Sequence, residues 1–150
     1  MYTDPRVIDL VTTSFHPVRI HVREDADAWK RVGGELGVQW TPTILLLDAA
    51  GVERHRIEGF LPADDFAAQL ALGLAKVAFA HSDFADAERR YRAIVETYPN
   101  AETAAEALYW AGVSKYKASN DPAALQDTAT AFTQRYQDSS WAKKSSVWRA

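Results

Sequence analysis

The residues most often used in catalysis and metal binding are sparse in this chain of 150 residues. It contains no cysteine, which excludes disulfides, thiolate nucleophiles and cysteine-ligated zinc for the chain as written. Its four histidines are His16, His21, His55 and His81, and none has the His-x-x-x-His spacing that places two metal ligands on one helical face. His21 and His55 could meet on neighbouring strands, but solvated or hydrogen-bonded histidines explain the pattern better than a metal site.

Hydroxyl and carboxylate groups do not form a convincing catalytic set either. Ser14 and Ser82 each stand close to a histidine in the sequence, but neither lies in the Gly-x-Ser-x-Gly turn that exposes a nucleophilic serine. The Asp64-Asp65 pair is better explained as negative charge at the start of a helix than as an acid–base pair. We therefore expect no catalytic residue, no cofactor and no metal ion in this chain.

Charge and glycine patterns give no sign of a nucleic-acid, nucleotide or membrane partner. The formal net charge is -3 and neither half of the chain is strongly basic. Gly33-Gly34 is not followed by the Lys-Ser or Lys-Thr of a phosphate-binding loop. Arg89, Arg90 and Arg92 are interspersed with acidic residues, which is typical of a solvated helical face. No apolar run approaches the ~20 residues that cross a bilayer.

The first sixty residues alternate between helical and strand patterns. Asp4 and Pro5 are typical of a helix N-cap and first helical position, so a short helix is expected to follow them. The apolar side of that helix comprises Val7, Ile8, Val11 and Phe15. Residues 18–22 alternate apolar with polar side chains, which predicts a strand with one buried face. Residues 27–36 have helical spacing and predict a short amphipathic helix.

A hairpin is expected next. Residues 43–47 are apolar on both faces, which predicts a strand covered on both sides. The segment from Asp48 to Gly51 has turn chemistry and leads into a second strand at 52–58. That second strand is rich in charged residues. Such residues are typical of an edge strand, because they discourage pairing with a further strand.

After Pro62 the chain is rich in alanine and has no strand candidate, which marks a boundary between domains at 1–62 and 63–150. Its breaks predict helices at 63–80, 84–98, 103–118 and 122–136, with a last helix beginning near Trp141. Three pairs of like residues recur 38 positions apart: Tyr98 with Tyr136, Ala104 with Ala142, and Trp110 with Trp148. This period is typical of a two-helix solenoid unit.

The first domain resembles the later part of a thioredoxin fold. The resemblance rests on the order of the elements, on Trp40-Thr41-Pro42 ahead of the apolar strand, and on Gly59 at the end of the hairpin. It implies a cis peptide bond before Pro42. It also implies that the backbone of Thr41 can pair with an extended peptide, in the manner of an added strand. The expected peptide-binding residues are Trp40, Thr41, Pro42, Gly59 and Phe60.

Thioredoxin-like redox chemistry needs two cysteines at a helix N-terminus, and this chain has neither. In the proteins it resembles, that pair lies just before the helix that here begins near Asp4. The resemblance also implies a strand before the cysteine pair, which this chain lacks. In the sheet, that strand would lie between the strands expected at 18–22 and 43–47. Three outcomes stay open: the two strands close up, another chain supplies a strand, or the true protein begins upstream of Met1. In the last case the complete protein could be a thiol–disulfide oxidoreductase with an upstream Cys-x-x-Cys.

Residues from about 70 to 150 resemble tetratricopeptide repeats. Phe84, Ala87, Tyr91 and Pro99 lie where the packing residues of one unit would be. The second unit matches less cleanly and the third is incomplete, which would leave an apolar face uncovered. The helix that begins at Ala63 could cover this apolar face, because it could pack against both domains.

Aromatic side chains on the expected helices could line a binding surface, because aromatics dominate binding hot spots, although packing between helices is the default. Trp148 differs because no later helix exists to cover it. The candidate partner-binding residues are Tyr109, Trp110, Tyr116, Trp141 and Trp148.

The expected fold class is α/β then all-α: a partial thioredoxin-like domain fused to tetratricopeptide-like helical hairpins. The expected function is a protein-interaction module that has no redox activity as given. Its partner is expected to be a protein or an extended peptide, with self-association through an open strand edge or the C-terminal helix as a further option. The lack of cysteine fits a reducing cytoplasm and equally a fragment of an exported protein.

Overall fold

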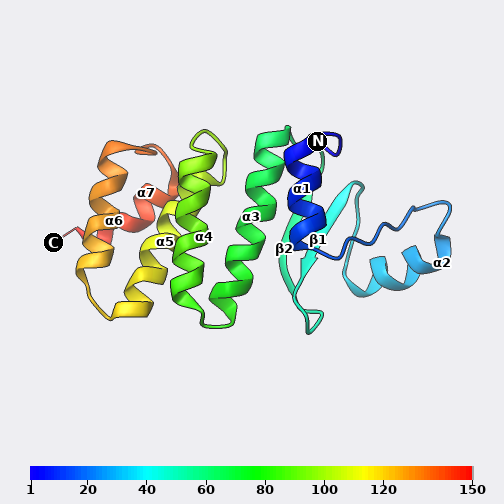
Figure 1. Cartoon of the computed structure of the whole chain (residues 1–150), viewed down its shortest axis with the longest axis horizontal. Helices are drawn as coiled ribbons and strands as arrows, with labels where there is room; N and C mark the ends of the chain where they lie inside the picture. The colour runs from blue at the N-terminus through cyan, green and yellow to red at the C-terminus, as the bar shows by residue number, and fades with distance from the viewer. Residues whose placement is uncertain (150) are drawn as a thin grey trace.

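The computed structural model describes residues 1–149. A β-hairpin, helix α1 and the short helical segment that begins with α2 occupy one part of the molecule, and a row of antiparallel helices extends from it to the C-terminal end (Figure 1). The helices are α1 (Pro5–Ser14), α2 (Ala26–Ala28), the π-helix η1 (Trp29–Gly33), α3 (Ala63–Ala80), α4 (Phe84–Thr97), α5 (Ala104–Ser119), α6 (Ala123–Gln134), α7 (Ser140–Ser145) and the 3-10 helix η2 (Ser146–Trp148). The strands are β1 (Thr43–Leu47) and β2 (Glu53–Glu58). No helix within residues 1–149 is long and apolar enough to span a bilayer.

Local sequence signals account for α1 and for the hairpin turn. The Asp4 side chain accepts a hydrogen bond from the backbone N–H of Arg6 at 2.9 Å, as an N-cap does. Asp48 closes the turn between β1 and β2 by accepting from the backbone N–H groups of Ala50 and Val52 at 2.9 and 3.0 Å. Gly51 has φ +78° in this turn, a conformation that favours glycine. The expected helix and hairpin are therefore confirmed.

The strand expected at 18–22 does not form, so that prediction is wrong. These residues adopt no regular structure up to Val22, which begins a turn, and Val18 is 85% exposed. The sheet of residues 1–149 has only two strands, β1 and β2, which pair antiparallel. A strand is stable only when a neighbour satisfies its N–H and C=O groups, and residues 18–22 have no such neighbour.

The helix expected at 27–36 forms, with a change in its winding. It begins as α2, continues as the π-helix η1 and ends near Gly37, which has φ +61°. Figure 1 shows that this segment projects beyond β1, away from the row of helices.

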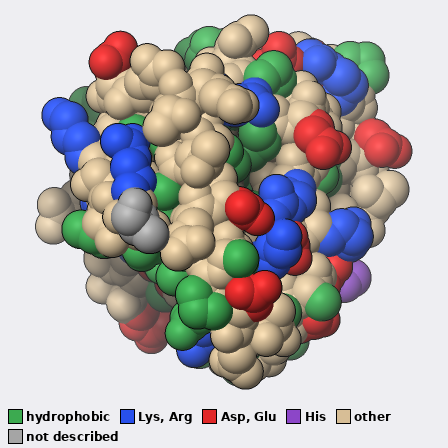
Figure 2. Space-filling view, turned by 90° about the vertical axis from the view of Figure 1, so that its left-hand side faces the viewer, with side chains coloured by type: hydrophobic (Ala, Val, Ile, Leu, Met, Phe, Trp, Pro, Cys, Tyr) green, Lys and Arg blue, Asp and Glu red, His purple; other side chains and the backbone are tan. Residues whose placement is uncertain are grey.

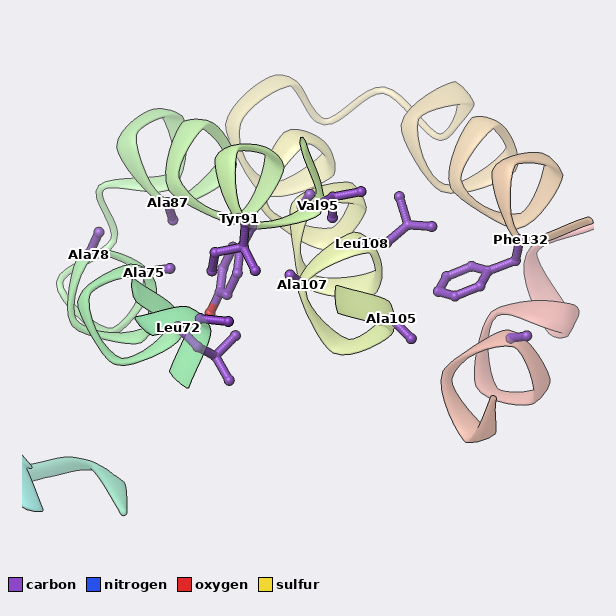
Figure 3. Close-up of a cluster of buried hydrophobic side chains, with 14 residues drawn as sticks. Leu72, Ala75, Ala78, Ala87, Tyr91, Val95, Ala105, Ala107, Leu108 and Phe132 are labelled. Atoms are coloured by element: carbon purple, nitrogen blue, oxygen red, sulfur yellow. The ribbon is translucent and has the colours of Figure 1, made fainter. Parts of the chain in front are cut away.

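Helix α3 packs against both halves of the molecule. Phe66 and Leu70 join Val7, Leu46 and Ile57 in a buried cluster between α3, α1 and the hairpin. On its other side, Leu72 and Ala75 join residues of α4 to α7 in a second buried cluster. Figure 3 shows Tyr91 of α4 pointing from one helix toward Leu72 of α3 within that second cluster. Helix α3 thus contributes side chains to two hydrophobic cores.

Helix α3 approaches the hairpin closely at Gly73. A Cβ atom at this position would lie 2.1 Å from Leu46 Cδ2 and 3.3 Å from His55 Cβ. The absence of a side chain at Gly73 therefore sets the distance between α3 and the sheet.

The helical region repeats a helix–turn–helix unit. The turn that joins α3 to α4 and the turn that joins α5 to α6 each contain one left-handed residue, Ser82 with φ 62° and Asn120 with φ 55°, 38 positions apart. Each is followed by an aspartate, Asp83 or Asp121, whose side chain accepts a backbone N–H at the start of the next helix. The 38-residue period noted in the sequence therefore has a counterpart in the helix turns.

Candidate functional site

The corner that precedes β1 brings together most of the expected peptide-binding residues. The Thr41–Pro42 peptide bond is cis. The backbone N–H of Gly59, just after β2, donates to the C=O of Pro42 at 2.8 Å. Thr43 Oγ1 donates to the C=O of Trp40 at 2.7 Å and thereby holds the entry to the corner. Gly59 and Pro42 are thus neighbours although they are 17 positions apart in the sequence.

Thr41 lies at the apex of this corner with its backbone unsatisfied. It is exposed, and neither its N–H nor its C=O hydrogen-bonds another residue within 1–149. Two large aromatic side chains flank the corner in the sequence, Trp40 at 69% exposed and Phe60 at 72% exposed. Strand addition uses unpaired backbone groups at a sheet edge, and exposed aromatic side chains are common at binding hot spots.

The register of the hairpin extends this open backbone along β1. Pro42 and Gly59 form a hydrogen-bonded pair, and such pairs alternate with non-hydrogen-bonded pairs along an antiparallel ladder. Thr43 and Leu45, which pair with Glu58 and Arg56, therefore direct their backbone groups away from β2. Together with Thr41 they form a continuous row of outward N–H and C=O groups, which we call the open edge of residues 41–47.

The two edges of this sheet differ in charge. Strand β1 has no charged side chain, whereas β2 carries Glu53, Arg54, Arg56 and Glu58. Arg56 binds Glu53 at 2.8 Å, and Arg54 binds Asp48 at 2.8 Å, where the Asp48 side chain is only 1% exposed. Charged side chains discourage further strand pairing, so β2 is protected in this way and β1 is not.

Four of the five residues in the second expected set, Tyr109, Trp110, Trp141 and Trp148, form an aromatic cluster. Trp148 stacks on Tyr109 with ring centroids 4.7 Å apart, and Tyr109 also contacts Trp110 and Trp141. Trp148 is therefore partly covered by a residue of α5, which the sequence did not reveal because the contact is not local. Tyr116 lies outside these aromatic contacts of the described chain.

The surface of the C-terminal end has mixed character. Figure 2 shows basic and acidic side chains interspersed there, with small hydrophobic patches between them. Lys144 lies over the Trp141 ring with its Nζ 3.8 Å from the ring centroid, a cation–π contact. This set is thus brought together by packing, and part of it stays accessible.

A polar cluster that sequence patterns did not reveal joins the hairpin to the helices. His55 of β2 lies between two residues of α3, with Nε2 2.5 Å from Gln69 Oε1 and Nδ1 3.2 Å from Lys76 Nζ. Lys76 also pairs with Glu106 of α5 at 3.1 Å. These residues are far apart in the sequence, and only the alternating pattern of β2 could have suggested that His55 faces inward.

Burial and nearby charges shift the pKa values of two side chains in this region, His55 and Tyr91. Burial lowers the pKa of His55, and the positive charge of Lys76 lowers it further. The neutral ring then accepts a hydrogen bond from Lys76 at Nδ1 and donates one to Gln69 at Nε2. Burial also raises the pKa of the Tyr91 hydroxyl, with a smaller contribution from the charge of Glu106.

Other candidate residues have structural roles. Asp64 forms an ion pair with Arg6 at 2.8 Å, and Asp65 accepts the backbone N–H of Glu102 at 3.2 Å. Arg89 and Arg90 both pair with Asp86 on their own helix. Within residues 1–149, no three histidine or acidic side chains lie close enough together to hold a metal ion.

Comparison with known proteins agrees with this architecture. Residues 1–73 match the family model of a thioredoxin-like domain. No curated protein and no solved structure matches the chain significantly. The fold is thus a partial thioredoxin-like domain followed by an all-α region.

The match ends within α3, the helix that both hydrophobic cores share. The matched segment includes the open edge of residues 41–47 and contains no cysteine.

Proposed function

We propose that this protein is an interaction module that binds an extended segment of a protein partner along the open edge of residues 41–47. The observation that carries the proposal is the exposed Thr41 backbone, whose N–H and C=O have no partner within residues 1–149. An added strand would satisfy these groups and continue the sheet beyond β1.

The side chains around the edge support the same proposal. Main-chain hydrogen bonds provide affinity without sequence preference, while pockets or aromatic anchors select side chains. Trp40 and Phe60 are large, exposed and rigid, and they stand at the same corner as Thr41. Tryptophan is among the residues most enriched at binding hot spots.

The helical region is proposed to act as a tetratricopeptide-like scaffold that carries this domain and offers a second surface. The 38-residue repeat of the turns at Ser82 and Asn120 supports a repeated two-helix unit. The accessible parts of Tyr109, Trp110, Tyr116, Trp141 and Trp148 would form the second surface. If so, Trp148→Ala should weaken binding of a protein partner that does not shift the NMR signals of residues 41–47.

The docking proposal is tested with peptides selected on the purified chain from a random heptamer display library. Titration of each selected peptide into ¹⁵N-labelled protein should shift the amide signals of Thr41, Thr43 and Leu45. Trp40→Ala and Phe60→Ala should each weaken binding by about tenfold, as truncation of a hot-spot aromatic does. Thr41→Pro, which removes the N–H, should weaken it as well.

A matched control is available at the other end of the molecule. Val147 is 80% exposed on η2, so Val147→Ala removes a comparable exposed apolar side chain without altering the edge. It should leave peptide affinity unchanged. Selected peptides that shift only signals of α5 to α7, or that bind Thr41→Pro as well as the unaltered chain, would contradict docking at the edge.

A second candidate function is thiol–disulfide exchange by a longer product of the same gene. The match of residues 1–73 to a thioredoxin-like domain favours it, together with the unpaired edge of β1. This candidate predicts an in-frame Cys-x-x-Cys codon pattern upstream of Met1 and insulin reduction by the longer protein. A stop codon directly upstream of Met1 would eliminate it.

A further inference from the structure

A chain of aromatic ring contacts crosses the helical region. Phe84 at the start of α4 contacts Phe79 of α3, with ring centroids 5.2 Å apart. Phe79 contacts Trp110 of α5 at 5.2 Å, and Trp110 contacts Trp141 of α7 at 6.5 Å. We call these four side chains the aromatic strip. All four are half-buried, so part of each side chain stays accessible.

A lysine lies over the ring at each end of the aromatic strip. Lys117 of α5 has its Nζ 5.4 Å from the ring centroid of Phe84, and Lys144 of α7 has its Nζ 3.8 Å from that of Trp141. Both lysines are exposed. An ammonium group has three donors and a ring face is only a weak acceptor, so both groups keep donors available for an anion.

These two lysines differ from the cations of the preceding helices because they have no acidic partner. Every lysine and arginine of α3 and α4 forms an ion pair with a carboxylate. Within residues 1–149, neither Lys117 nor Lys144 forms such a pair. The aromatic strip therefore has an apolar middle and an uncompensated positive charge at each end. This pattern is complementary to a segment in which carboxylates flank apolar side chains.

We propose that the aromatic strip binds an extended acidic segment of a protein partner, whose apolar side chains cover the rings and whose carboxylates pair with Lys117 and Lys144. This inference rests on the second surface of the proposed function and names the chemistry of the partner that would bind there. It does not depend on the open edge of residues 41–47, where main-chain hydrogen bonds would hold the partner.

The ring contacts limit the spacing of the two carboxylates. The three successive centroid separations place Phe84 and Trp141 at most about 17 Å apart, a distance that an extended chain spans in about five residues. The carboxylates of the partner are therefore up to about five positions apart, with apolar residues between them.

A single-stranded nucleic acid fits the aromatic strip less well. Such strands stack their bases face to face on aromatic rings and lay their phosphates along a basic groove. Phe79 instead packs edge-to-face with Phe84 and with Trp110, at interplanar angles of 70° and 71°, so these rings cover part of one another's faces. The positive charges of Lys117 and Lys144 stand at the ends of an apolar middle, which does not match a phosphate at every nucleotide.

The test uses the full chain labelled with ¹⁵N and a panel of synthetic peptides. In each peptide two aspartates flank a run of about two to four leucine and phenylalanine residues, the range that the length of the strip allows. Binding should shift the indole N–H signals of Trp110 and Trp141. The indole signal of Trp40, at the open edge of residues 41–47, should stay in place. The two surfaces are thereby observed separately in one spectrum.

A matched pair of lysine variants tests the ion pairs. Lys144→Gln removes the charge over Trp141 and should weaken the tightest peptide by about threefold to fivefold, as loss of an exposed ion pair does. Lys143→Gln removes an equal charge from the adjacent exposed position of α7 and should have little effect, because Lys143 lies over no aromatic ring within residues 1–149. Equal effects of the two variants would contradict the inference.

A charge exchange tests the same contact from both sides. Lys144→Glu should bind the aspartate peptide more weakly than Lys144→Gln does, because the new carboxylate repels it. A peptide with lysine in place of one aspartate should bind Lys144→Glu more tightly than it binds the unaltered chain. Absence of this exchange would show that Lys144 does not meet the charge of the peptide.

The remaining outcomes separate this inference from docking at the open edge. Asparagine in place of both aspartates keeps the shape of the peptide and should weaken binding by about tenfold, the loss of two such ion pairs; equal affinity would overturn the acidic partner. A shift of the Trp40 indole alone would overturn binding at the strip and support the open edge. No indole shift with any peptide of the panel would overturn the strip and leave the edge to its own selected peptides. Tighter binding of oligothymidylate at Trp110 and Trp141 would identify a nucleic acid as the occupant and likewise overturn the inference.

Discussion

His55 Nδ1 lies 3.2 Å from Lys76 Nζ, and this contact connects the sheet of the thioredoxin-like domain to the helix shared by both cores. Because the lysine is a donor only, the imidazole must be neutral at Nδ1 to accept from it. The same lysine pairs with Glu106 of α5. One cation therefore joins β2, α3 and α5, and its contact with β2 depends on the protonation of one histidine.

Stability should consequently depend on pH through His55. Its pKa is lowered in the folded protein, so the unfolded chain binds a proton first as pH falls through about 6.5. The contribution of neutral His55 is thus complete above that pH and decreases below it. Urea unfolding followed by circular dichroism at about pH 7 and about pH 5 should show a smaller decrease in His55→Gln than in the unaltered protein. His16→Gln, an exposed control, should keep the full decrease.

Removing the charge of Lys76 should raise the pKa of His55. Burial would still disfavour the protonated ring, but the repulsion from the ammonium group would be gone in Lys76→Met. Glu106→Gln should act in the opposite direction, because the carboxylate of Glu106 favours the imidazolium. NMR titration of the His55 Cε1–H signal measures both. An unchanged His55 pKa in Lys76→Met would show that the contact has no electrostatic effect.

Gly73→Ala should destabilise the protein by about 1 to 3 kcal/mol, the usual range for overpacking. The added methyl group would lie 2.1 Å from Leu46 Cδ2, so either Leu46 or α3 must move. Gly34→Ala is the control, because its Cβ would meet no atom within 4 Å and its φ is −66°. Chemical denaturation of Gly73→Ala, Leu46→Ala and the double variant should show a double-variant loss smaller than the sum of the two single losses. Additive losses would contradict the close approach.

Ser82→Gly should stabilise the protein by about 1 kcal/mol, since Ser82 is held in the left-handed region with φ 62°. Asn120 occupies the corresponding place after α5 with φ 55°, and asparagine tolerates this conformation better than serine. Asn120→Gly should therefore have a smaller effect. Thermal unfolding of the two variants compares them directly, and a destabilised Ser82→Gly would contradict the strain assigned to that turn.

The sequence by itself determined the elements that depend on neighbouring residues. Asp4 and Pro5 start α1 through a side-chain cap and a preset φ, and the turn from Asp48 to Gly51 closes the hairpin. The helix from Ala63 to Ala80 begins and ends at the residues that the sequence pattern predicted. These signals act within a few residues, so they can be read along the chain.

Tertiary structure decided what depends on distant partners. Residues 18–22 have the pattern of a strand but stay unpaired, because strand formation needs a neighbour that satisfies the backbone. Trp148 is partly covered by Tyr109 because η2 packs against α5, and His55 meets Lys76 because β2 packs against α3. The accessible edge at Thr41 is likewise a property of the assembled sheet, since its backbone groups are free only where no second neighbour pairs with β1.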